Sequence, residues 1–171
     1  MGSLFRLVRF VVVAMCVSTG AATAADPGIF SLGVGQYDII PNDNKSIATY
    51  LQYRFGVGPE QPSGFLGVKP VIGAMANTDG GLYGYAGLAA PFTIGSGGFQ
   101  IEPAAGVGAY RQGHSTNLGG TFEFHLGLSA TQRIGRALRV GVALNHISNA
   151  NIHVRNRGTN VAMATVGWEF R

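Results

Sequence analysis

The two residues whose types and spacing best suit chemistry are His146 and Ser148, in the run LNHISNAN from Leu144 to Asn151. Side chains two positions apart on a β-strand point the same way, so on a strand this imidazole and this hydroxyl become neighbours. A base beside a hydroxyl is the arrangement that activates a serine nucleophile. The alternative is that both residues only mark the point where a strand passes into water, where polar side chains are ordinary.

The rest of the sequence does not suggest a metal or cofactor site. The four histidines fall on different predicted strands and loops and lack the spacing of metal ligands. The single cysteine, Cys16, lies in an apolar N-terminal run, so the sequence after that run has no thiol and no disulfide. We therefore expect chemistry that needs neither a metal nor another cofactor.

Stretches near the C-terminus alternate apolar residues with polar or small ones, which is the pattern of a β-strand with one apolar face. In 138–148 the even positions begin Leu, Val, Val, Leu, and His146 and Ser148 continue this face. Clusters of Gly, Pro, Asn, Asp and Ser divide the chain into eight such stretches. The expected strands are 29–40, 46–56, 64–77, 82–94, 98–111, 120–133, 137–148 and 160–170.

The composition indicates that these strands cross a membrane. Charged residues make up 12% of the chain, against about 25% in ordinary globular proteins, and there are 27 glycines. We predict an all-β fold, an eight-stranded antiparallel up-and-down transmembrane β-barrel with its apolar face toward lipid. A water-soluble barrel would instead crowd Phe, Leu and Trp inside, and a pore is disfavoured because eight strands leave room only for side chains. The expected interior ion-pairing or hydrogen-bonding residues are Glu102, Glu123, His125, Arg133, Arg139 and Glu169.

The N-terminus predicts export. Arg6 and Arg9 precede a short apolar run, and small residues ending at Ala24 form a cleavage site, so residues 1–24 read as a cleaved signal peptide. A permanent transmembrane helix is the rival interpretation, but the run is shorter than the roughly 20 apolar residues that a spanning helix needs. Residues 25–171 then form a single barrel domain in a bacterial outer membrane, with the loop from Asn149 to Thr159 outside the cell. The modest net charge of +4 does not suggest nucleic acid as a partner.

The run His146-x-Ser148-Asn149-Ala150, followed by Asn156-x-Gly158, resembles the signature of the PagL-type outer-membrane lipid A deacylases. The resemblance extends to the signal peptide, the eight-strand layout and, more loosely, the glycine-rich stretch 105–108. It implies an enzyme that removes an ester-linked acyl chain from lipid A without a metal, with lipopolysaccharide and outer-membrane lipids as its partners. Carried over, Ser148 is the nucleophile, His146 is the general base, and Asn149 with the backbone N–H groups near Ala150 holds the oxyanion.

The sequence departs from this family at the acid of the triad. The acid is expected fourteen residues after the histidine, where this chain has Asn160 instead of glutamate. Asn160 falls on the outward face at the start of the last strand, so the geometry survives while the charge is lost. An asparagine can orient the histidine but stabilises an imidazolium less. Glu123 and Glu169 are predicted to point inward and are poor substitutes. A milder departure is Asn151, where a glycine is common in the family.

Two arginines of the following loop, Arg155 and Arg157, have the chemistry to meet lipid A phosphates, and the alternative is an ordinary solvated loop. The competing function is a non-catalytic small barrel, structural or adhesive, that kept the motif and lost its acid. The sequence leaves open which acyl chain is cut and whether two barrels associate as a homodimer.

Overall fold

The computed structural model describes residues 26–40, 43–57 and 67–170, which form an all-strand molecule. The strands are β1 (Gly28–Gln36), β2 (Ile47–Arg54), β3 (Lys69–Asn77), β4 (Leu82–Ala89), β5 (Phe92–Ile94), β6 (Phe99–Arg111), β7 (Phe122–Ile134), β8 (Leu138–Ser148) and β9 (Thr159–Phe170). The predicted signal peptide lies outside the described residues. No helix long and apolar enough to span a membrane occurs in the ranges just given.

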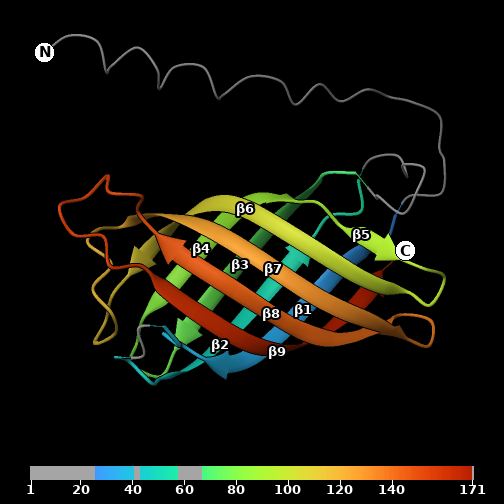
Figure 1. The fold of residues 1–171 in the computed structure, drawn as a ribbon, viewed down its shortest axis with the longest axis horizontal. Coiled ribbons are helices and arrows are strands. Elements are labelled where there is room, and N and C mark those ends of the chain that lie inside the picture. Colours follow the sequence, from blue (N-terminus) through green and yellow to red (C-terminus); the bar gives the residue numbers. More distant parts are fainter. Residues whose placement is uncertain (1–25, 41–42, 58–66, 171) are drawn as a thin grey trace, which may run out of the picture.

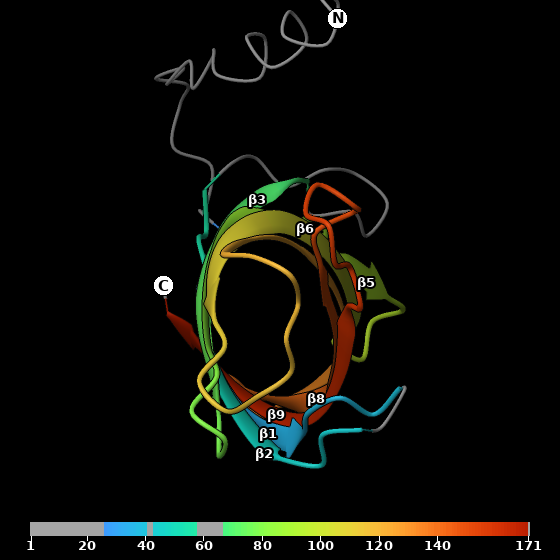
Figure 2. The same cartoon turned by 90° about the vertical axis from the view of Figure 1, so that its left-hand side faces the viewer.

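The strands close into an antiparallel barrel (Figures 1 and 2). β1 pairs with β2 on one side and with β9 on the other, which closes the sheet. β4 and β5 both pair with β6, so they are two parts of one interrupted strand, and the barrel has eight strands. The predicted fold class is confirmed.

The structure corrects two of the predicted strands. The stretch 82–94 is not continuous, because Ala90 and Pro91 separate β4 from β5 and proline has no N–H for the ladder. The stretch 29–40 ends as a strand at Gln36, because Asp38 has a left-handed φ of 57°, which does not fit an extended strand. Part of a third predicted strand, residues 64–66, lies outside the described residues.

The two faces of the sheet carry different side chains. On β7 the outward Leu126 and Leu128 are 55% and 50% exposed, whereas the inward Glu123 and His125 are fully buried. The interior holds a core of tyrosines and apolar residues, and His125 stacks on Tyr85 with ring centroids 3.9 Å apart. The apolar face therefore points toward lipid, as predicted, which excludes a water-soluble barrel with its apolar face inside.

Four of the six expected interior residues form ion pairs toward the end of the barrel where Gly28 pairs with Phe170, and Glu123 and His125 form none within the described residues. Arg139 Nη1 and Arg133 Nη2 lie 2.8 and 3.0 Å from one carboxylate oxygen of Glu169. Arg54 Nε lies 3.4 Å from Glu102. The opposite end carries the loops 37–46, 78–81, 112–121 and 149–158, and it is there that β8 ends and β9 begins.

Candidate active site

His146 and Ser148 lie at the loop end of β8, on the outward face, and both are half-buried. In the antiparallel register His146 stands directly opposite Leu126 on β7 and Asn160 on β9, and Ser148 stands opposite Phe124. The predicted strand pairing is thus confirmed at this point. It brings the imidazole, the hydroxyl and the Asn160 amide together on the lipid-facing wall.

A short chain of hydrogen bonds fixes the orientation of the imidazole. His146 Nδ1 lies 2.9 Å from Asn160 Oδ1, and Asn160 Nδ2 donates to the carbonyl of Ile40 at 2.8 Å. A carbonyl oxygen only accepts, so it requires the nitrogen of the amide on its side and leaves the oxygen facing the histidine. His146 Nδ1 is therefore the donor of this bond, and in the neutral imidazole the lone pair then lies on Nε2, which is the nitrogen that a general base uses.

Gly158 provides space beside the pair. A Cβ at this position would lie 3.2 Å from His146 Cε1 and 3.5 Å from Ser148 Cβ, so all three residues border one small volume. Gly158 also has a φ of 66°, which side-chain-bearing residues rarely adopt. The Ser148 hydroxyl makes no hydrogen bond to His146 in the described part of the chain, and such contacts are often loose in enzymes without substrate.

A tight turn follows Ser148. The N–H of Ile152 donates to the carbonyl of Asn149 at 3.0 Å, and the two central residues, Ala150 and Asn151, have φ of 51° and 65°. These are the features of a type I′ turn, which is unusual without glycine and costs on the order of 1 kcal/mol per left-handed residue. Asn156 braces the turn by accepting from the Asn149 N–H at 3.1 Å and donating to Asn151 Oδ1 at 3.2 Å.

The two predicted oxyanion residues have different surroundings. Asn149 is completely buried, and its Nδ2 donates to the carbonyls of Leu118 at 2.6 Å and Arg155 at 2.7 Å. Its amide therefore ties two loops together inside the barrel, on the face opposite to His146 and Ser148. The exposed Ala150 N–H has no hydrogen-bond partner within the described residues. Of the two, only Ala150 offers a free donor next to Ser148.

Comparison with known proteins identifies the family. The sequence pattern of the family described as lipid A 3-O-deacylase (PagL) matches residues 36–169, which is most of the chain. The chain belongs to this family. No curated protein sequence matches it significantly.

Solved structures resemble the PagL-family fold seen here. The structure described as the crystal structure of the outer membrane enzyme PagL has a TM-score of 0.68 at 18% identity, covering 82% of this chain and 98% of that chain. Neisserial surface protein A (NspA) gives 0.55 at 9% identity over 84% and 96%. A de novo designed transmembrane β-barrel gives 0.53 at 11% identity over 87% and 99%. At these identities the likeness concerns the fold. Together with the family match, it assigns the protein to the outer membrane.

The two arginines that were expected to bind lipid phosphates, Arg155 and Arg157, have different surroundings. Arg157 Nη2 contacts Asp38 Oδ2 at 2.8 Å and Asp43 Oδ2 at 2.9 Å, whereas Arg155 is exposed. Burial lowers the pKa of Arg157, but the hydrogen bonds and charges of the two carboxylates outweigh it and raise that pKa overall. The ion pairs of Arg157 therefore connect its loop to the loop that carries Asp38 and Asp43. The side chain of Arg155 remains available to a ligand.

Glu123 and Glu169 do not replace the missing carboxylate of this PagL-family site. Glu123 is fully buried inside the barrel, and Glu169 lies near the far end, bonded to arginines. In the ranges that the structure describes, no group of three or more His, Cys, Asp or Glu side chains is arranged to hold a metal ion.

Sequence reasoning missed the support behind Asn160. Asp38 was expected to be an ordinary strand residue. The Ile40 group is a backbone carbonyl, which every residue carries, so no residue type indicates its role. The signal that could have revealed Asp38 is an acidic residue three positions before Pro41, the start of a Pro/Asn/Asp cluster, where a side chain often forms hydrogen bonds with the turn.

Proposed function

We propose that the protein removes an ester-linked acyl chain from lipid A by a serine-histidine mechanism on the outer wall of the barrel. The observation that carries the proposal is the bond between His146 Nδ1 and Asn160 Oδ1, which leaves Nε2 as a base beside Ser148. A serine hydroxyl activated by an oriented histidine is the arrangement that acyl transfer requires.

The reaction takes two steps. Ser148 Oγ attacks the ester carbonyl carbon while its proton passes to His146 Nε2, and the imidazolium then gives that proton to the departing alkoxide oxygen of lipid A, which leaves as a hydroxyl. Water next attacks the acyl-serine with His146 again as base, which releases a fatty acid and restores Ser148. The free N–H of Ala150 is the nearest backbone donor along the chain for the oxyanion formed in each step.

The surroundings of Ser148 suit a lipid substrate. Leu126, Leu144 and Phe124 flank the two reactive side chains, and Leu126 and Leu144 are about half exposed on the outer wall. An acyl chain can therefore remain in an apolar environment while its ester reaches the loop end, where headgroups lie. The exposed Arg155 in the neighbouring loop has the charge to contact a phosphate of the same lipid.

Asn160 makes this a weakened form of the triad. A neutral amide orients His146 but gives the developing imidazolium less electrostatic stabilisation than a carboxylate does. We therefore expect slow hydrolysis. The competing function, a non-catalytic barrel, predicts that the purified protein leaves lipid A intact.

Mass spectrometry of lipid A distinguishes the two functions. Folded protein in detergent is incubated with lipopolysaccharides of different acylation, beside a matched Ser148→Ala variant that lacks only the hydroxyl oxygen. We expect one acyl chain to be lost with the native protein and not with the variant. Equal acyl loss in both, or none from any substrate, would overturn the proposed function.

A further inference from the structure

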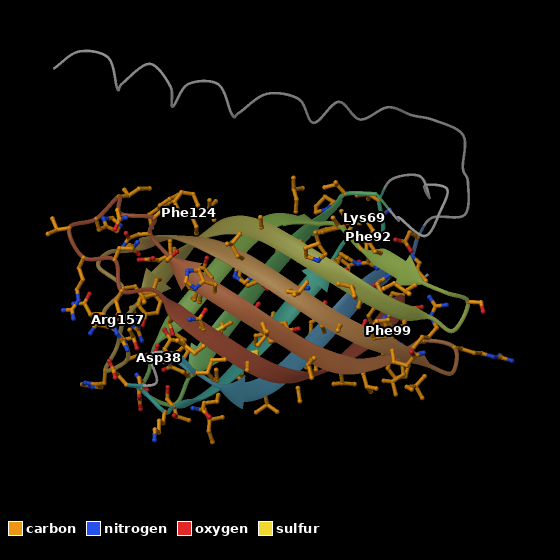
Figure 3. The ribbon with its side chains drawn as sticks, viewed as in Figure 1. Asp38, Lys69, Phe92, Phe99, Phe124 and Arg157 are labelled. Atoms are coloured by element: carbon orange, nitrogen blue, oxygen red, sulfur yellow. The ribbon has the colours of Figure 1, made fainter. Side chains whose placement is uncertain are left out.

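A set of polar contacts beside the candidate site joins the end of β1 to the start of β9. Asp38 is completely buried, and its carboxylate accepts hydrogen bonds from the Asn44 N–H at 3.1 Å, the Arg157 guanidinium at 2.8 Å and the Thr159 hydroxyl at 3.0 Å. Figure 3 shows Asp38 and Arg157 at the same end of the barrel. One carboxylate thus connects loop 37–46, loop 149–158 and the first residue of β9.

The residues next to these contacts are the ones that hold Asn160. Two positions after Asp38, the Ile40 carbonyl accepts from Asn160 Nδ2 at 2.8 Å, and between them the Ile39 N–H donates to the Asn160 carbonyl at 2.9 Å. On the other strand, Thr159 directly precedes Asn160. The carboxylate of Asp38 therefore anchors both the segment that supplies the carbonyl and the strand that carries the amide.

This support matters because an amide, unlike a carboxylate, has two different ends. If the Asn160 amide turned over, Nδ2 would face His146 Nδ1, which would then have to accept a hydrogen bond. The ring proton would move to Nε2, and the histidine could not take the proton of Ser148. The Ile40 carbonyl opposes this rotation, because it would meet an oxygen instead of an N–H.

We propose that Asp38 is a positioning residue for catalysis, which keeps the Ile40 carbonyl on Asn160 and thereby keeps the base nitrogen of His146 free. The inference rests on the proposed function and deepens it. The asparagine makes the site depend on this buried carboxylate, whereas an acid in its place would present equivalent oxygens to His146 in either orientation.

A double-mutant cycle tests the dependence. Asp38→Ala is expected to lower kcat for lipid A hydrolysis by roughly 10- to 100-fold with little change in KM, because it misplaces the base and leaves the outer wall intact. The same change in the Asn160→Glu background is expected to lower kcat less than about threefold. An equal loss in both backgrounds would reduce Asp38 to a general structural residue, and no loss in the native background would overturn the inference.

Two further variants separate folding effects from positioning. Asp38→Asn keeps the size of the side chain and removes only the charge, so it serves if Asp38→Ala does not fold. Asp43→Asn is the matched control, because Asp43 contacts the same Arg157 group but its side chain is 72% exposed. We expect Asp43→Asn to retain native kcat, because its contact does not support Ile40. A loss as large as that of Asp38→Asn would assign the effect to Arg157 and would overturn the role of Asp38.

A measurement without turnover keeps this inference distinct from the proposed function. Nitrogen NMR of the folded protein in micelles reports which ring nitrogen of His146 carries the proton, with His146→Gln as the assignment control. We expect an Nδ1–H tautomer in the native protein and a mixture in Asp38→Asn. The same tautomer in both would overturn the inference. Activity that survives Ser148→Ala would overturn the proposed function and leave this result standing.

Discussion

The barrel contains two polar clusters of opposite character, one inside it and one on its wall. The interior cluster at the end of the barrel where Gly28 pairs with Phe170 is ionic, with Arg139 and Arg133 sharing the Glu169 carboxylate. The outer cluster at the loop end consists of His146, Ser148 and the uncharged Asn160. The charges of this interior cluster are thus matched by opposite charges, while the lipid-facing site is built from groups that can be neutral.

The difference reflects the cost of charge at each position. An unpaired charge toward lipid loses hydration without compensation, whereas an interior carboxylate recovers part of that loss from its arginine partners. A neutral amide on the outer wall avoids the cost but supplies less stabilisation to an imidazolium. It also needs a carbonyl partner to fix its orientation. The interior cluster should therefore determine stability, and the outer cluster should determine activity.

The largest expected effect is on the interior cluster. Glu169→Gln leaves the buried Arg139 without its charged partner and should lower the free energy of unfolding by about 3 kcal/mol. Activity per folded molecule should not change, because the site lies at the other end of β8. Urea unfolding in micelles and acyl release provide the two measurements. Arg136→Gln, in the exposed turn after β7, is the control. A parallel loss of activity would contradict the separation of the two clusters.

The second effect concerns the outer cluster. Asn160→Glu should raise the rate of acyl release about tenfold or more, because a carboxylate stabilises the imidazolium that forms in the reaction. Stability should fall slightly, since the new charge faces the lipid boundary. Rates measured by mass spectrometry beside Asn160→Ala, which should be slower than the native protein, test this. An unchanged rate in the glutamate variant would show that the missing acid does not limit catalysis.

The smallest effect concerns the space beside the nucleophile. Gly158→Ala places a methyl group 3.2 Å from His146 Cε1 and should lower acyl release several-fold, with a stability cost of about 1 kcal/mol from the left-handed backbone. Gly135→Ala is a matched control, because Gly135 has the same φ of 66° with nothing within 4 Å of its added Cβ. Similar activity in the two variants would contradict the crowding at the site.

Most of the fold could be predicted because alternation is a local property of the sequence. The last predicted strands, 120–133, 137–148 and 160–170, nearly coincide with β7, β8 and β9, since their apolar faces repeat at every second residue. The break at Pro91 was missed because its flanking residues are apolar and continue the pattern. The early end of β1 was missed because the left-handed φ of Asp38 depends on partners as distant as Arg157 and Thr159.

For the candidate site, the sequence predicts which side chains come together but not how the Asn160 amide is oriented. His146 and Asn160 lie opposite each other because of the antiparallel register. That register is nearly determined by the predicted strands 137–148 and 160–170 and by the length of the loop between them. The orientation of the Asn160 amide depends on a backbone carbonyl 120 residues away, and no residue type signals it. For the same reason the sequence could suggest a phosphate contact for Arg157 but not its pairing with two acids of the first loop.

The outward direction of Ser148 has a kinetic consequence. An enzyme with a cleft encounters substrate that diffuses in three dimensions, whereas Ser148, the nucleophile we propose, encounters only molecules that diffuse sideways within the same leaflet. The quantity that sets the rate is then the number of lipid A molecules per unit of membrane area, not their concentration in the sample. Adding inert lipid to the bilayer should slow each barrel even when the amounts of protein and substrate are unchanged.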